Sequence, residues 1–91
     1  MWIAERDTTR QRATDEDRAM AHVSYGSAEN REDARALLLT GIKAEIQHYL
    51  DGPVAYFNAS CVIRLTMIMG ELLDNSEVNA AECDGLRFRV R

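Results

Sequence analysis

The sequence is poor in residues that break or cross-link a chain. It contains one proline, five glycines and two cysteines in 91 residues. So little proline and glycine leaves no room for a low-complexity linker, and the length suits one domain over residues 1–91. Two cysteines, Cys61 and Cys83, are too few for a disulfide framework, so we expect reduced thiols.

Long apolar runs and an excess of basic residues are also lacking. No stretch of about 18 apolar residues is present, so we expect no membrane-spanning helix. The first residues show no apolar run behind a positive lead-in, so we expect no secretory signal and a cytoplasmic protein. Eleven Lys and Arg against fifteen Asp and Glu give a net charge of −4. This charge disfavours a protein that coats nucleic acid with an evenly basic surface.

Motifs for catalysis or cofactor binding are missing as well. The sequence has no glycine motif for phosphates or dinucleotides and no H-E-x-x-H zinc motif. The residues of the types that bind zinc are His22, His48, Cys61 and Cys83. No two of them stand at the sequence spacing that is typical of a pair of zinc ligands. Cys61 lies in an apolar pattern without a neighbouring cation to activate it, so we expect a core residue. We therefore predict a non-enzymatic protein with no cofactor and no metal site.

The strongest pattern that is present is helical and covers residues 28–50. Apolar residues recur there every three or four positions, at Ala34, Leu38, Ile42, Ile46 and Tyr49. This spacing places them on one side of a helix. The segment 51–53, Asp-Gly-Pro, ends the pattern and can begin another, because glycine terminates helices and proline is tolerated at a first helical position.

A central helix is predicted over residues 54–74. It is apolar almost all round, and only Ser60, Arg64 and Glu71 form a polar strip. A helix of this kind normally has neighbours on more than one side. Because the connection between the two helices is short, we expect an antiparallel hairpin.

Shorter elements are predicted at both ends of the chain. They are an N-terminal arm or strand over 1–13, helices over 15–24 and 77–83, and a strand over 86–91. The last segment alternates apolar and arginine residues, which is typical of a half-buried strand. A strand needs a partner for its backbone groups, and residues 2–3 or the same strand of a second chain are candidates. The sequence thus predicts a mainly α fold with one terminal strand.

Self-association is predicted from the apolar surface of the central helix. We expect the short elements to leave several of its large side chains uncovered, namely Phe57, Ile63, Met67 and Ile68. Burial of one such side chain is worth about 1.5–3 kcal/mol, so together they would form a sticky patch. We therefore predict a homodimer or higher oligomer in which two hairpins close a four-helix arrangement. The alternative is a monomer whose N-terminal segment covers this face.

Acidic residues line the outer side or the ends of the helix predicted over 28–50. They are Glu29, Glu32, Asp33, Glu45 and Asp51, and Glu71 and Asp74 lie near the end of the helix predicted over 54–74. Acidic patches speed association with basic partners and can occupy a groove made for nucleic acid. We predict a protein-binding module that inhibits or regulates a nucleic-acid-handling protein with a basic surface, as small phage or mobile-element effectors do. The plain alternative is a solvated face that keeps the protein soluble.

Two other functions stay open. Arg87, Arg89 and Arg91 share one face of the terminal strand, and a dimer could present them to phosphates as a small DNA-binding transcription regulator. The acidic helices oppose this reading, and outward charge is also how edge strands avoid aggregation. The third possibility is an oligomer that sequesters a small ligand in a pocket between helices.

Overall fold

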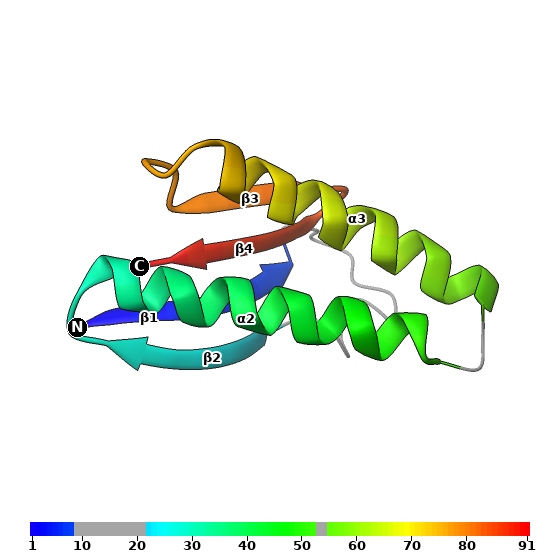
Figure 1. Ribbon diagram of the computed structural model, residues 1–91, viewed down its shortest axis with the longest axis horizontal. Coiled ribbons are helices and arrows are strands. Elements are labelled where there is room, and N and C mark those ends of the chain that lie inside the picture. Colours follow the sequence, from blue (N-terminus) through cyan, green and yellow to red (C-terminus); the bar gives the residue numbers. More distant parts are fainter. Residues whose placement is uncertain (9–21, 53–54) are drawn as a thin grey trace.

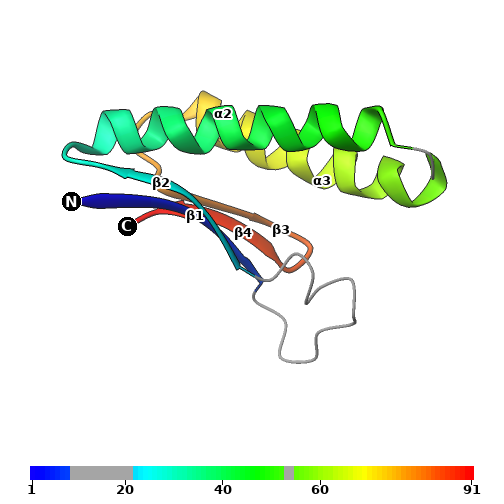
Figure 2. The same ribbon diagram turned by 90° about the horizontal axis from the view of Figure 1, so that it is seen from below.

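The computed structural model describes residues 1–8, 22–52 and 55–91, which form two layers. One layer is a four-stranded antiparallel sheet, and the other is a pair of long helices that covers one face of it (Figure 1). Figure 2 shows the helices on one side of the sheet only. In chain order the elements are β1 (Trp2–Thr8), β2 (His22–Ala28), α2 (Arg31–Leu50), α3 (Ala55–Asp74), β3 (Ala80–Cys83) and β4 (Leu86–Val90).

The prediction of a mainly α fold that closes a four-helix arrangement is wrong, because a sheet covers the inner side of both helices. The two long helices and the terminal strand are present. The short helix predicted over 77–83 is wrong, since residues 80–83 form β3. Residues 9–21, which contain most of the helix predicted over 15–24, lie outside the described residues, and residues 22–24 belong to β2.

The first and last strands of the chain form the centre of the sheet. The strand order is β2-β1-β4-β3, and all neighbours are antiparallel. Ala4 of β1 lies opposite Val90 of β4. Beyond them Ile3 and Arg91 exchange two backbone hydrogen bonds with N···O distances of 2.6 and 2.9 Å. The strand at 86–91 therefore pairs with the segment around residues 2–3 of its own chain.

The terminal strand β4 alternates between the two faces of the sheet. Leu86, Phe88 and Val90 are buried beneath the helices, whereas Arg87 and Arg89 lie on the open face. Successive side chains of a strand point to opposite faces, so a strand with one covered face needs this two-residue period. The arginine face predicted from the sequence is therefore the open face of the sheet.

The core lies between the sheet and the helices. Its helical members are almost completely buried and are Ala34, Leu38 and Ile42 of α2 with Cys61, Leu65, Ile68 and Leu72 of α3. Within each helix they recur every three or four residues and so lie on one side. Beneath them Phe88 stacks on Tyr25, with ring centroids 5.9 Å apart. The sheet thus covers the inner side of α3, for which the sequence had suggested a second molecule.

Local signals set the start of α2 and the last turn of the sheet. The side chain of Asn30 accepts a hydrogen bond from the backbone N–H of Asp33 at 2.8 Å, which caps α2. The helix begins at residue 31 rather than 28 because β2 extends to Ala28. Asp84 and Gly85, with φ of 49° and 80°, form the tight turn between β3 and β4.

Candidate functional site

The antiparallel helices bring the start of α2 to the same end of the molecule as the end of α3 (Figure 1). Exposed carboxylates gather at this end of the helical layer, and we call them the acidic end: Glu29, Glu32, Asp33, Asp74 and Glu77. The first three belong to the acidic face predicted from the sequence. The other two come from the end of α3 and the loop that follows, and only the fold brings them near α2.

The other two residues of the predicted acidic face lie elsewhere. Asp51 follows the last residue of α2, about 30 Å from its start, and accepts hydrogen bonds from Gln47 at 3.1 Å. Glu45 lies between the layers with its side chain 18% exposed, and it binds the guanidinium of Arg6. It also accepts a hydrogen bond of 2.5 Å from the hydroxyl of Tyr25. Glu45 is therefore an internal partner and contributes little to the acidic surface.

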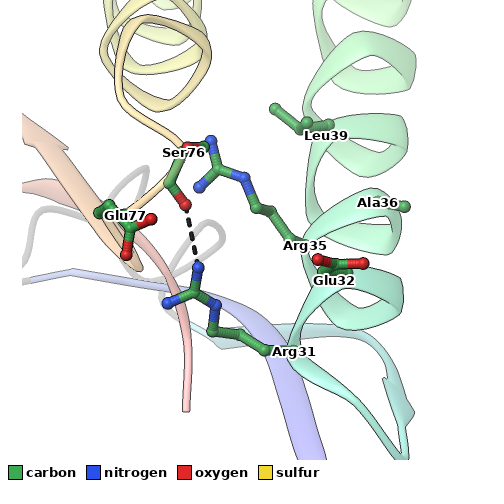
Figure 3. Close-up of a pocket in the computed structure, with 7 residues that line it drawn as sticks. All are labelled: Arg31, Glu32, Arg35, Ala36, Leu39, Ser76 and Glu77. Carbon is green, nitrogen blue, oxygen red and sulfur yellow. Dashed lines mark hydrogen bonds between the residues drawn. The ribbon is translucent and has the colours of Figure 1, made fainter.

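Two arginines of α2 bind the backbone at and after the end of α3, and Figure 3 shows the hydrogen bond of Arg31. Arg31 donates a hydrogen bond to the carbonyl of Ser76 at 3.0 Å. Arg35 donates to the carbonyl of Val78 at 2.5 Å and also to that of Leu72. The last carbonyls of a helix lack partners within it and form its negative end, so they favour a cation. The two arginines thus anchor the loop that carries Glu77.

A pocket of about 320 Å³ opens beside these arginines (Figure 3). It is lined by Arg31, Glu32, Arg35, Ala36, Leu39, Ser76 and Glu77. Glu32 comes from α2 and Glu77 from the facing loop, so carboxylates stand on both sides of it. The arginine donors are directed at backbone carbonyls. The pocket is therefore lined by two guanidinium groups and two carboxylates, whose formal charges balance.

On the open face of the sheet, the arginines of β4 face acids of β1. Arg89 donates a hydrogen bond to Glu5 at 2.7 Å, and Nε of Arg91 lies 2.6 Å from the same oxygen. Arg87 pairs with Asp7 at 3.3 Å. The register of the two strands places Glu5 opposite Arg89 and Asp7 opposite Arg87. Each arginine predicted to bind nucleic acid therefore has a carboxylate partner.

Glu5 is buried on this face, with 1% of its surface exposed. Burial raises the pKa of its carboxyl, but the hydrogen bonds and charges of Arg89 and Arg91 outweigh this effect, so the pKa is lowered overall. The second oxygen of Glu5 lies 4.0 Å from Nδ1 of His22. Glu5 thus stays ionised and joins the central strands.

A second polar cluster joins β1, β2 and α2 beneath the helices. Arg6 is 5% exposed and pairs with Glu45, which also accepts the hydroxyl proton of Tyr25. Burial and the neighbouring carboxylate raise the pKa of Tyr25, so its hydroxyl remains a donor. The cluster connects three elements and has the features of a structural network.

The residues predicted to mediate self-association fall into different places. Ile63 and Met67 are 60% and 61% exposed on α3. Ile68 is fully buried in the core and faces the sheet. Phe57 belongs to α3, but its side chain lies outside the part of the chain that the structure describes. Only two of the four are therefore known to be accessible to a partner.

The possible metal ligands do not come together. Across residues 1–8, 22–52 and 55–91, no group of three His, Cys, Asp or Glu could hold a metal ion. Cys61 is a buried free thiol in the core, but the prediction that it has no neighbouring cation is wrong, because the guanidinium of Arg64 lies 3.6 Å from its Sγ. Cys83 is half-buried, with its Sγ 4.0 Å from Sδ of Met67. As for membranes, no helix in the described part of the chain is long and apolar enough to cross one.

Sequence reasoning missed Arg31, Arg35 and Glu77 as parts of this site. The only local signal was the spacing of the two arginines, four residues apart on one side of a helix. The carbonyls that they bind lie 37 to 45 positions later in the chain. No local pattern connects positions so far apart.

Comparison with known proteins adds no relative. The chain matches no family model, no curated protein and no solved structure. The acidic end is therefore characterised by its own geometry and charge.

Proposed function

We propose that this chain is a non-enzymatic binding protein whose acidic end docks on a basic surface of another macromolecule. The observation that carries this proposal is the gathering of five exposed carboxylates at one end of the helices, where two arginines only partly offset their charge. The positive end of α2 and the negative end of α3 meet there and offset each other, so the excess negative charge comes from the side chains. A groove that holds nucleic acid on a partner protein has the complementary charge, and occupying it would inhibit or regulate that partner.

The buried ionisable groups support a binding role over catalysis. Glu5 and Glu45 are each held by arginines, and the hydroxyl of Tyr25 is committed to Glu45. A general base or nucleophile must reach the substrate proton or carbon that it attacks. Glu5, Glu45 and Tyr25 instead contact other side chains of the protein and join its strands and helix, which favours a structural role for them.

The other two functions receive less support. A phosphate that approached Arg87 or Arg89 would compete with Asp7 and Glu5, which already pair with them. The pocket at the acidic end is at the small end of the range for ligand sites, and four of its seven lining residues are charged. Small-ligand sites are mostly apolar, so this pocket fits a side chain of a docked partner better.

Charge reversal on α2 tests the proposal. Tagged protein expressed in the source cell is used to capture its partner, and Glu32→Lys should weaken capture by about tenfold because it places a cation at the basic surface. Asp51→Lys makes the same change in net charge at the opposite end of α2 and should leave capture unchanged. Both positions are exposed, so melting temperatures should stay close to that of the parent. Equal capture by the two variants would contradict the proposal.

A further inference from the structure

One side of α3 is left uncovered by the sheet and carries an apolar stripe. Ile63 and Met67, four residues apart, are 60% and 61% exposed. Gly70 continues the stripe, and a Cβ placed there would meet no atom within 4 Å. Residues three or four positions apart lie on the same side of a helix. Ile63, Met67 and Gly70 therefore form one open surface, which we call the outer α3 stripe.

Two opposite charges flank this stripe. Arg64 lies three residues before Met67, and Glu71 lies four residues after it, so both are on the same side of α3. Glu71 is exposed. The guanidinium of Arg64 lies 3.6 Å from Sγ of Cys61, and its Nε is buried without a hydrogen-bond partner. Within the described residues, Arg64 is thus a cation without a carboxylate partner.

We propose that the outer α3 stripe is the contact between two copies of this chain, related by a two-fold axis near Met67. The two α3 helices then run antiparallel, and Arg64 of each copy lies opposite Glu71 of the other. Both pairs form together, because a two-fold contact is self-complementary. A second copy supplies Glu71, Arg64 and the apolar residues around Met67 in the order that this surface needs. An unrelated partner would have to provide a cation, an anion and an apolar centre in the same order.

The proposed contact combines apolar burial with charge pairing. It covers Ile63 and Met67 on both copies, and the missing side chain of Gly70 lets the second helix approach closely. A contact made by one side of one helix is small, so we expect micromolar rather than nanomolar affinity. The acidic end lies outside the stripe, so the dimer would present two copies of it. The proposal therefore stands or falls independently of the proposed function.

Sedimentation equilibrium of the full chain tests the contact. At about 100 µM we expect a mass near twice that of the 10.3 kDa chain, with dissociation near 1 µM. Met67→Glu should weaken association by about tenfold or more. Leu50→Glu is the matched control, because Leu50 is 62% exposed at the end of α2, outside the stripe, and it should associate like the parent. A monomer at every concentration, or equal loss in both variants, would overturn the proposal.

A charge swap tests the antiparallel arrangement. Glu71→Arg places two cations opposite each other and should weaken association by about tenfold, whereas Glu77→Arg, an equal charge change outside the stripe, should not. Combining Arg64→Glu with Glu71→Arg restores both pairs with reversed polarity and should recover most of the association. Circular dichroism checks that each variant is folded. Failure of a folded double variant to recover would overturn the arrangement. If the double variant does not fold, the two single variants decide. Equal association of Glu71→Arg and Glu77→Arg would then overturn the antiparallel arrangement.

Discussion

At the scale of single residues, the absence of one side chain decides how a helix meets the sheet. A Cβ at Gly41 would lie 2.7 Å from Cε1 of Tyr25 and 2.8 Å from its Cγ. These distances are shorter than van der Waals contact, so only glycine lets the Tyr25 ring fit beneath α2. The same ring stacks on Phe88 and brings its hydroxyl to Glu45.

The two glycines within helices should respond oppositely to alanine. Gly41→Ala should destabilise the chain by about 1–3 kcal/mol, because the overpacked ring must move. Gly70→Ala adds a methyl group in open space and should stabilise the monomer by up to about 1 kcal/mol through helix propensity. Urea unfolding near 1 µM, where we expect the monomer, measures both. If both substitutions raised or both lowered the free energy of unfolding, the packing described for Gly41 and Gly70 would be contradicted.

The lowered pKa of Glu5 predicts how the stability of the folded chain depends on pH. Its pKa in the folded chain is lowered below the usual 4.5 because Arg89 and Arg91 outweigh its burial, so the folded state favours the ionised form. This stabilisation is present above the unfolded pKa and is lost as the pH falls through the lowered folded pKa. Glu5→Gln should therefore be less stable than the parent at about pH 7, with a difference that shrinks below about pH 4. Melting temperatures across this range test it, and a pH-independent difference would refute it.

At the scale of elements, the end of α3 depends on donors from α2. Arg35→Met keeps the apolar stem but removes the donors to the carbonyls of Leu72 and Val78, and should destabilise by about 1–3 kcal/mol. Arg31→Met removes one exposed hydrogen bond to Ser76 and should cost less. Thermal unfolding of the two variants compares them. An equal or larger loss of stability for Arg31→Met would show that Arg35 is not the main residue that holds the end of α3 and the loop after it.

Elements differ in how far the sequence could predict them. The helices α2 and α3 each span 20 residues, long enough for the helical period to be recognised. The strand β3 has only the four residues Ala-Ala-Glu-Cys, which favour helix, and pairing with β4 overrides that preference. In β2, Gly26 has a φ of 121° beside a register shift opposite Ala4 and Glu5. The irregular part of this strand thus lies between positions where the sequence predicted the end of one helix, at 24, and the start of the next, at 28.

At the scale of the whole molecule, the sheet decides which charges stay available. The arginines of β4 could be predicted from their alternation, but their partners Glu5 and Asp7 lie about 80 positions earlier, and only the β1–β4 register reveals them. Likewise, the acids around the start of α2 and Asp74 at the end of α3 could be predicted, whereas Glu77 joins them through the loop after α3, which the sequence had assigned to a short helix. The open face therefore pairs its charges, and the acidic end keeps an excess of one sign.

The most direct test of the acidic end is an amide NMR titration of the labelled chain with a hexa-arginine peptide. We predict chemical-shift changes concentrated at residues 29–33 and 74–77. They should weaken with added salt, because exposed charges are screened beyond about 8–10 Å. Changes concentrated around Glu5 and Asp7 on the open face, or spread evenly over all exposed carboxylates, would contradict the account.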